Sequence, residues 1–154
     1  LSAFMLLPDW FLSRVLGTLV FPDDGAPRLD TIAVAMAGMW TIPLLLSTWV
    51  GARARDAGHA RGAPWAAAVT AFAIFLGSEA LAPRVPLWSP TPAVPTVLGV
   101  APYVLPAELG LGLAVYVAWE RTREDGWPLR VGAGFGIALA YLGALCLGWM
   151  ALGA

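Results

Sequence analysis

The chain has 154 residues, of which 59% are hydrophobic and only 12% are charged, and its formal net charge is −1. A soluble domain carries roughly twice that charged fraction, so the composition predicts a membrane protein whose surface faces lipid. The net charge argues against a nucleic-acid partner, which would need a basic face on the protein. The length fits one domain over residues 1–154.

A single cysteine and a single histidine restrict the cofactor chemistry of the chain. Cys146 has no partner for an internal disulfide or a multi-cysteine metal site, and its apolar segment predicts a small packing residue. His59 stands among arginines, where we expect it to be solvated, and one histidine excludes haem ligation by two histidines of the same chain. We therefore expect neither a metal ion nor a cofactor.

The first apolar segment, residues 1–21, is long enough to cross a membrane, but Pro8, Asp9 and Arg14 interrupt it. Proline fits the first turn of a helix. We expect a span here, with Asp9 and Arg14 forming a structural pair that faces protein or headgroups. The alternative is a short helix from Asp9 to Val20 in the membrane interface. The segment lacks the features of a secretory signal peptide. Because the first residue is Leu rather than Met, we expect the sequence to begin after a missing or processed N-terminus.

A membrane-crossing helix needs roughly 20 mostly apolar residues. Four further segments meet that requirement: Thr31–Val50, Pro64–Ala82, Val97–Trp119 and Val131–Leu152. The sequence therefore predicts an all-α, polytopic transmembrane helix bundle with five spans. The alternative architecture has four spans and an N-terminal interfacial helix.

Arginines concentrate in two of the predicted loops, residues 51–63 and 120–130. The alternate loops, residues 22–30 and 83–95, contain one arginine each. Because arginine-rich loops stay on the cytoplasmic side, we expect loops 51–63 and 120–130 to be cytoplasmic, in an inner membrane of bacterial type. Tryptophans near the ends of the spans agree with this orientation: Trp49, Trp65, Trp119 and Trp127.

The loop "FPDDGAPRLD" contains three aspartates, Asp23, Asp24 and Asp30. Their carboxylate oxygens could bind a cation. Turn and capping roles are the simpler interpretation, because "DDG" is typical of a turn and Asp30 precedes the apolar segment as a helix N-cap would.

A carboxylate, Glu79, lies about one turn from the expected outer end of its span. Phe72 and Phe75 precede it by seven and four residues, which places all three side chains on one helix face. Glu79 could simply bond to Arg84 near the headgroups. Alternatively, it could belong to a functional site.

A second carboxylate, Glu108, lies in the middle of the segment Val97–Trp119, and Tyr116 follows it on roughly the same face. Pro102 and Pro106 stand just before Glu108 and predict a helix kink there. Membrane carboxylates are costly, so they usually face a cavity or a polar partner. Glu108 could serve a function or could make a structural hydrogen bond between helices.

Acids in such surroundings have a chemical use. Burial in a medium of low dielectric favours the neutral form of a carboxyl group, and a protonated carboxyl can deliver a proton to an alkene or epoxide. Aromatic faces can then stabilise the resulting carbocation. We expect Glu108 and Glu79 to be catalytic and a prenyl-type substrate to be bound by aromatic residues: Trp40, Phe72, Phe75, Trp88, Tyr103, Tyr116 and Tyr141.

A helix that ends in "GSEALAPRVPLW", followed by one that contains "YVLPAELG", resembles small integral-membrane proteins of carotenoid and terpenoid biosynthesis. These are the membrane lycopene cyclases, the carotenoid hydratases and related membrane terpene cyclases. The resemblance covers roughly residues 71–119. It implies cofactor-independent, proton-initiated chemistry on a polyprenyl substrate, with Glu79 and Glu108 as the acids. The adjacent Pro-Leu-Glu-Glu of the membrane lycopene cyclases is absent, which leaves cyclisation and hydration both open.

Two other functions stay open at this point. One is a non-catalytic lipid or tetrapyrrole binder, similar in size and tryptophan content to the five-helix translocator family. The other is a proton-coupled transport subunit, because two membrane acids can relay protons, although few polar residues are present in the spans to line a path. The sequence contains no phosphate-binding glycine loop, nucleophile elbow or dinucleotide fingerprint.

Small residues in the spans predict close helix packing. Gly132 and Gly136 form a small-xxx-small pair, and Gly110 and Gly112 lie on the helix of Glu108. We expect these glycines to pack within the chain. The alternative is a contact between two copies in a homo-oligomer.

Overall fold

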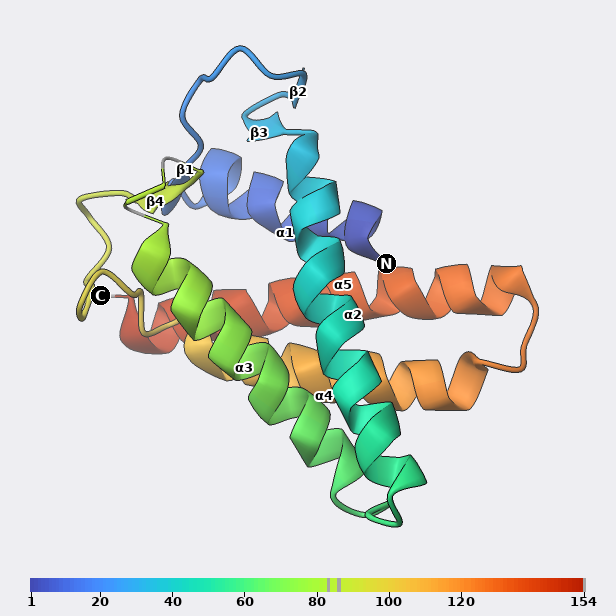
Figure 1. The fold of residues 1–154 in the computed structure, drawn as a ribbon. Helices are drawn as coiled ribbons and strands as arrows, with labels where there is room; N and C mark the ends of the chain where they lie inside the picture. The colour runs from blue at the N-terminus through green and yellow to red at the C-terminus, as the bar shows by residue number, and fades with distance from the viewer. Residues whose placement is uncertain (83, 86, 154) are drawn as a thin grey trace.

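The computed structural model describes residues 1–82, 84–85 and 87–153, and their arrangement is a bundle of helices (Figure 1). Pro83, the first residue of the expected loop 83–95, lies outside the described residues, as do Pro86 and Ala154. The four long helices are α2 (Ala35–Asp56), α3 (Ala63–Leu81), α4 (Leu105–Thr122) and α5 (Trp127–Leu152). The expectation of a helical bundle is confirmed.

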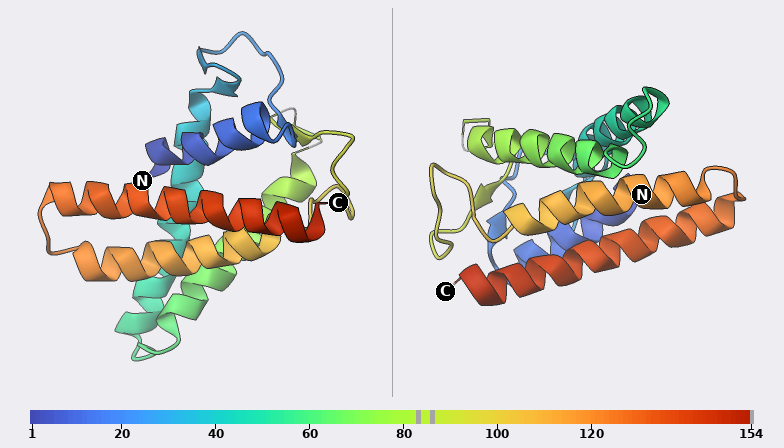
Figure 2. Two further views of the ribbon diagram at one scale, coloured as in Figure 1. Left: turned by 180° about the vertical axis from the view of Figure 1, so that it is seen from behind. Right: turned by 90° about the horizontal axis from the view of Figure 1, so that it is seen from below.

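The long helices form two hairpins that cross each other. α2 and α3 are joined at the lower end of Figure 1 and diverge from there, while α4 and α5 run across behind them (Figures 1 and 2). The helix α4 packs against both α3 and α5 and connects the two hairpins. α2 and α3 lie farther apart at the end opposite their short connection than at the connection itself (Figure 1).

Three helices of the described chain, α2, α3 and α5, are long and apolar enough to cross a membrane. Their outer faces carry large apolar side chains in contact with solvent, including Leu45, Val69 and Leu147. Contiguous exposed apolar surface of this kind is rare on soluble monomers and marks a surface that meets lipid or another protein. The helices therefore fit a membrane protein.

The helix α4 begins later than expected. It starts at Leu105, and residues 97–104 form turns and an isolated bridge between Val97 and Val100. Pro106 occupies the first turn of α4, where its missing N–H is harmless. The predicted kink is therefore wrong, and Glu108 lies in the first turn of its helix rather than in its middle.

The N-terminal segment is helical over a short length. It consists of a 3₁₀ turn η1 (Ser2–Met5), α1 (Leu6–Trp10) and a π-helical turn η2 (Phe11–Val15). Residues 2–15 give about 21 Å of helix at ~1.5 Å per residue, less than the ~30 Å hydrocarbon core of a bilayer. The segment packs on the bundle, with η1 against α2 and α1 against α5.

Two short antiparallel ribbons, which sequence analysis did not predict, close the end of the bundle near α1. β1 (Leu19–Val20) pairs with β4 (Ser89–Pro90), in a register that places Leu19 opposite Pro90. β2 (Arg28–Leu29) pairs with β3 (Ile32–Ala33) through a turn in which Asp30 has a φ of 55°. The ribbon β1–β4 therefore ties the loop after η2 to the loop after α3.

An ion pair joins the two arginine-rich segments, residues 51–63 and 120–130. Arg55 Nη1, near the end of α2, donates to both carboxylate oxygens of Glu120 at 2.6 and 2.5 Å, and Tyr116 OH donates to the same carboxylate. These contacts join the end of α2 to the end of α4. Residues 51–63 and 120–130 are therefore in contact through this ion pair.

The Arg55–Glu120 contact predicts a pH-dependent contribution to stability. Glu120 lies just beyond the expected span, and the hydrogen bonds from Arg55 lower the pKa of its carboxyl below the usual 4.5. Because the folded-state pKa is lowered, this stabilisation is complete above pH ~4.5 and is lost as the pH falls through the folded-state value. We expect Glu120→Gln to lower the melting temperature in detergent at pH 7 and to lower it by less at pH 3, where the unfolded state already binds the proton. An equal effect at both pH values would contradict this linkage.

The contact between α3 and α4 depends on one glycine. A Cβ added at Gly112 would lie 2.5 Å from the Cβ of Ala71 and 3.0 Å from the Cα of Ala68. The same atom at Gly110, Gly132 or Gly136 would meet nothing within 4 Å. The prediction of close packing within the chain is therefore confirmed for Gly112 and wrong for the other three glycines.

Two alanine substitutions on α4 test this packing. We expect Gly112→Ala to destabilise the protein by about 1–3 kcal/mol, because the helices must separate to admit the methyl group. Gly110→Ala is the matched control and should leave stability unchanged or raise it, since alanine is the better helix former. Equal melting temperatures of the two variants in detergent would exclude Gly112 as a packing determinant.

Candidate functional site

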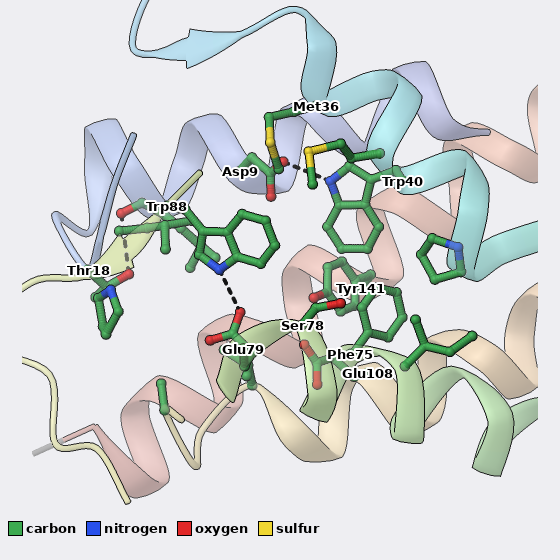
Figure 3. A pocket seen from close by; sticks show the side chains of 18 of the residues that line it. Asp9, Thr18, Met36, Trp40, Phe75, Ser78, Glu79, Trp88, Glu108 and Tyr141 are labelled. Atoms are coloured by element: carbon green, nitrogen blue, oxygen red, sulfur yellow. Dashed lines mark hydrogen bonds between the residues drawn. The ribbon is translucent and has the colours of Figure 1, made fainter. Parts of the chain in front are cut away.

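A cavity of about 180 Å³ lies where α2 and α3 diverge (Figure 3). α2 and α3 supply two of its walls, and α4 and α5 contribute Glu108 and Tyr141. The N-terminal segment and the ribbon β1–β4 close the end of the cavity that lies away from the α2–α3 connection, which we call its outer end. Its lining is Asp9, Leu12, Thr18, Leu19, Phe21, Met36, Met39, Trp40, Ile42, Pro43, Ile74, Phe75, Ser78, Glu79, Trp88, Pro90, Ala101, Tyr103, Val104, Glu108 and Tyr141.

The cavity opens on the surface between α2 and α3. Ile42 lines it and is also 60% exposed on the outer face of α2. Pro43, one residue further, has no N–H to donate to the carbonyl of Met39, so the local helix ladder is interrupted beside the opening. Since α2 and α3 are both candidate spans, an apolar molecule could enter from lipid without crossing water.

Glu108 is the acid that the protein leaves unsatisfied. Its side chain is only 3% exposed, it reaches the cavity from the first turn of α4, and its Oε2 has no hydrogen-bond partner among the residues that the structure describes. A buried acceptor without a donor costs about 1–3 kcal/mol. Such atoms call for an explanation in a native structure. The predicted interhelical hydrogen bond is therefore not the role of Oε2.

Glu79 reaches the cavity from the last turns of α3 and accepts a hydrogen bond from Trp88 Nε1 at 3.0 Å. Arg84, the partner that sequence analysis considered, instead donates to the carbonyl of Ala80 at 3.5 Å. The carboxylate of Glu79 and the ring of Trp88 thus form one unit at the outer end of the cavity (Figure 3).

Asp9 is a third acid of the site, which sequence analysis missed. Its side chain is only 4% exposed and accepts a hydrogen bond from Trp40 Nε1 at 2.8 Å. The expected pair with Arg14 is wrong, because Arg14 lies 3.7 Å from Asp30 at the surface. The available signal was the apolar sequence around Asp9, which is typical of a buried acid rather than a surface ion pair.

Aromatic rings surround the space between the acids. The centroid of Trp40 lies 5.2 Å from that of Phe75 and 5.8 Å from that of Tyr141, with interplanar angles of 54° and 74°. Tyr103 lines the same cavity and donates its hydroxyl proton to Thr18 Oγ1 at 3.0 Å. Ring edges and faces held in this way present fixed π surfaces to a ligand.

Two of the predicted binding residues lie elsewhere. Phe72 and Tyr116 belong to the described part of the chain but do not line the cavity. Tyr116 packs with Ala63 and Ala67, beside the arginine-rich segment 51–63. Its ring lies so close to Gly51 that a Cβ added there would be 2.5 Å from Tyr116 Cδ2. The structure does gather Glu108, Glu79 and the other predicted aromatics: Trp40, Phe75, Trp88, Tyr103 and Tyr141.

The aspartates of loop 22–30 do not reach this cavity. Asp23 and Asp24 accept hydrogen bonds from the N–H groups of Gly25 and Ala26, at 3.2 and 3.0 Å, as the predicted turn role requires. Asp30 accepts from Trp10 Nε1 at 2.9 Å. Its predicted capping role is wrong, because the residue that caps α2 is Val34. Within the described ranges, no cluster of His, Cys, Asp and Glu could hold a metal ion.

The fold and the site together describe a helical bundle with three helices of membrane-crossing length. Its cavity is lined by three carboxyl groups and by aromatic rings. The chain belongs to the family described as "Domain of unknown function (DUF6989)", whose model matches residues 6–152. No curated protein and no solved structure matches the chain.

Proposed function

We propose that the protein is an integral-membrane terpenoid cyclase or hydratase that protonates a polyprenyl-type substrate. The observation that carries this proposal is Glu108, whose buried Oε2 has no partner among the described residues and borders an aromatic cavity. A carboxyl group in this position can hold a proton and deliver it to whatever enters. An apolar chain is the ligand that such a lining favours.

The first step is proton transfer from Glu108. The O–H bond of its carboxyl group breaks, and the π electron pair of a substrate alkene forms a C–H bond with the proton, which leaves the neighbouring carbon positively charged. The remaining carboxylate lies in the first turn of α4, where the helix dipole favours negative charge. The faces of Trp40, Phe75 and Tyr141 stabilise the carbocation through their quadrupoles.

The cation can then react in one of two ways. In a cyclase, a second alkene of the same chain attacks the cation and closes a ring, and a carboxylate removes a proton to form the final alkene. In a hydratase, the lone pair of a water molecule attacks the cation, and the oxygen then loses a proton. Glu79, which Trp88 holds at the outer end of the cavity, is the proposed acceptor of that last proton.

The cavity size limits what can be bound. A cavity of ~150 Å³ accommodates benzene, so about 180 Å³ holds the reacting end of a prenyl chain rather than a whole chain. The rest of the chain would extend through the opening at Ile42 into lipid. The same comparison argues against the tetrapyrrole-binding alternative, because four linked rings exceed this volume.

The membrane topology of the proposal is the alternative with four spans, α2 to α5, and the N-terminal segment, which is too short to cross the hydrocarbon core, lies in the membrane interface. Loops 51–63 and 120–130 face the cytoplasm of an inner membrane of bacterial type, so the cavity lies near the outer surface. A homodimer formed through Gly132 and Gly136 stays a prediction, supported by the open space beside both glycines.

Deuterium labelling tests the proposed function. The purified protein, in lipid nanodiscs made in D₂O, is incubated with linear prenyl alkenes and with their terminal epoxides, and the products are analysed by mass spectrometry. From the alkenes we expect a cyclised or hydrated product that carries deuterium at the protonated carbon. From the epoxides, in which the oxygen takes the proton, we expect a cyclised or hydrated product whose initiating step adds no deuterium to carbon. Recovery of every substrate unchanged and unlabelled, from protein whose fold is intact, would contradict the proposal.

A further inference from the structure

The cavity carries acidic groups without a basic residue to balance them. Asp9, Glu79 and Glu108 line it, and none of the lining residues in the described chain is an arginine, a lysine or a histidine. Two of the three acids accept a hydrogen bond from an indole N–H, Asp9 from Trp40 and Glu79 from Trp88. An indole donates a hydrogen bond but brings no positive charge, so a cationic ligand would meet no positively charged side chain among the described lining residues.

Glu108 adds an acceptor that no protein group satisfies. Its side chain is more than nine-tenths buried, its Oε2 is unpartnered in the part of the chain that the structure describes, and it borders the cavity. A ligand that brings an N–H donor with a positive charge would satisfy this oxygen with a charge-assisted hydrogen bond. A purely apolar ligand would leave it unsatisfied.

The aromatic walls favour the same kind of ligand. The ring centroids of Phe75 and Tyr141 each lie within 6 Å of that of Trp40, and the three rings line the space that Glu108 borders. Aromatic rings bind alkylated ammonium groups through their negative faces, most strongly where water is excluded. We propose that the cavity is a binding site for lipophilic ammonium ions, in which the ammonium N–H donates to Glu108 and the alkyl tail leaves through the opening at Ile42.

This inference goes beyond the proposed reaction, because the site can bind an ammonium ion whether or not it protonates an alkene. The charged ligand enters as the ammonium ion, or it enters as the neutral amine and takes the proton of the Glu108 carboxyl. In the first case the carboxyl of Glu108 releases its proton to water as the ammonium ion binds. In the second case the O–H bond breaks and an N–H bond forms, and both routes give the same ion pair. If the enzyme stabilises a carbocation, an ammonium ion of similar shape resembles the charged intermediate and should compete with the substrate.

Binding can be measured with two probes of the same shape. N,N-dimethyldecylamine carries the cation at pH 7, and 2-methyldodecane replaces its nitrogen by a CH group. The protein is placed in nanodiscs of zwitterionic lipid, which has no net charge to attract the amine, and binding is followed by tryptophan fluorescence against empty nanodiscs. We expect the amine to bind at least about tenfold more tightly than the hydrocarbon, the size of one desolvated cation–π contact.

Two variants assign the site. Glu108→Gln removes the charge and should bring the affinity for the amine to within about threefold of that for the hydrocarbon. Glu124→Gln makes the same chemical change on a side chain that is 86% exposed and outside the cavity, so it should leave amine binding unchanged. If Glu108→Gln fails to fold, the comparison of the two probes on the wild-type protein still decides the question.

The outcomes separate this inference from the proposed reaction. Equal affinities for the amine and the hydrocarbon would overturn the inference, and so would amine binding that Glu108→Gln leaves unchanged. Labelled product without amine binding would overturn the ammonium site and support the reaction. Amine binding that depends on Glu108, without any product, would support the site and contradict the reaction.

Discussion

Glu108→Gln should reduce formation of the deuterium-labelled product by about 10²–10⁴-fold, the usual contribution of a general acid. Glutamine keeps the size and the hydrogen-bonding oxygen of the side chain but has no acidic proton to transfer. Glu124→Gln is the control, because the side chain of Glu124 is exposed and its nearest ion partner, Arg123, is at the surface. Turnover that Glu108→Gln leaves unchanged would remove Glu108 from the catalytic role.

A second substitution separates catalysis from structure at the same position. Glu108→Met replaces the unsatisfied carboxyl by an apolar side chain of similar length. Because Oε2 has no donor among the described residues, we expect this variant to be inactive yet as stable as the wild type or more stable, by up to about 3 kcal/mol. A melting temperature in detergent well below that of the wild type would indicate that Glu108 serves the fold. A residue that lowers stability and supports activity is typical of a functional site.

Asp9→Leu should give the second large effect, with loss of activity and of about 3 kcal/mol of stability. Asp9 is buried and accepts the indole hydrogen bond of Trp40 at 2.8 Å. Leucine removes the acceptor and leaves the N–H of Trp40 without a partner, at a cost of about 1–3 kcal/mol besides the lost bond. The ring of Trp40 would then be free to turn away from Phe75 and Tyr141, whose contacts define the cavity wall.

Asp9→Asn distinguishes positioning from proton transfer. The amide oxygen of asparagine can still accept from Trp40, but the residue can no longer exchange a proton. We expect Asp9→Asn to keep the near-ultraviolet circular dichroism of the wild type and most of its activity, because Asp9 acts through Trp40. Loss of activity in Asp9→Asn with an unchanged spectrum would instead make Asp9 a catalytic residue.

A double-mutant cycle completes the argument for this pair. Trp40→Phe removes the indole N–H and keeps an aromatic ring, so Asp9→Leu should cost less stability in the Trp40→Phe background than in the wild type. We expect a coupling energy of about 0.5–3 kcal/mol, which is the range for residues in direct contact. If the effects of the two substitutions on the free energy of unfolding were additive, the hydrogen bond would contribute nothing to stability.

Helix boundaries show one limit of sequence-based prediction for this chain. Apolar segments predicted the long helices because lipid selects length and composition, and α3 agrees with its predicted bounds to within one residue at each end. The start of α4 was placed eight residues too early, since residues 97–104 are as apolar as a helix but contain Pro102. Hydropathy measures the surroundings of a segment, whereas the hydrogen bonds of the backbone determine where a helix begins.

Helix geometry also explains which site residues were predicted and which were not. Phe75 and Glu79 are four residues apart and both line the cavity. Phe72 is seven residues from Glu79 and Tyr116 is eight residues from Glu108, and neither lines it. A helix rises ~1.5 Å per residue, so Tyr116 lies about 12 Å along α4 from Glu108. That distance takes it beyond a cavity of about 180 Å³ and toward the arginine-rich end.

The sequence by itself determined that this chain is helical and apolar, and that Glu79 and Glu108 stand in segments where an acid is costly. Only the tertiary structure decided that Asp9 joins them, because its location depends on how the N-terminal helix packs across α2 and α5. It also decided which acid has no partner, since Trp40 and Trp88 come from distant parts of the chain to satisfy the other two. The local sequence shows whether a residue lies in apolar surroundings. It does not show which distant residue will contact it, because those contacts form only when the helices pack across one another.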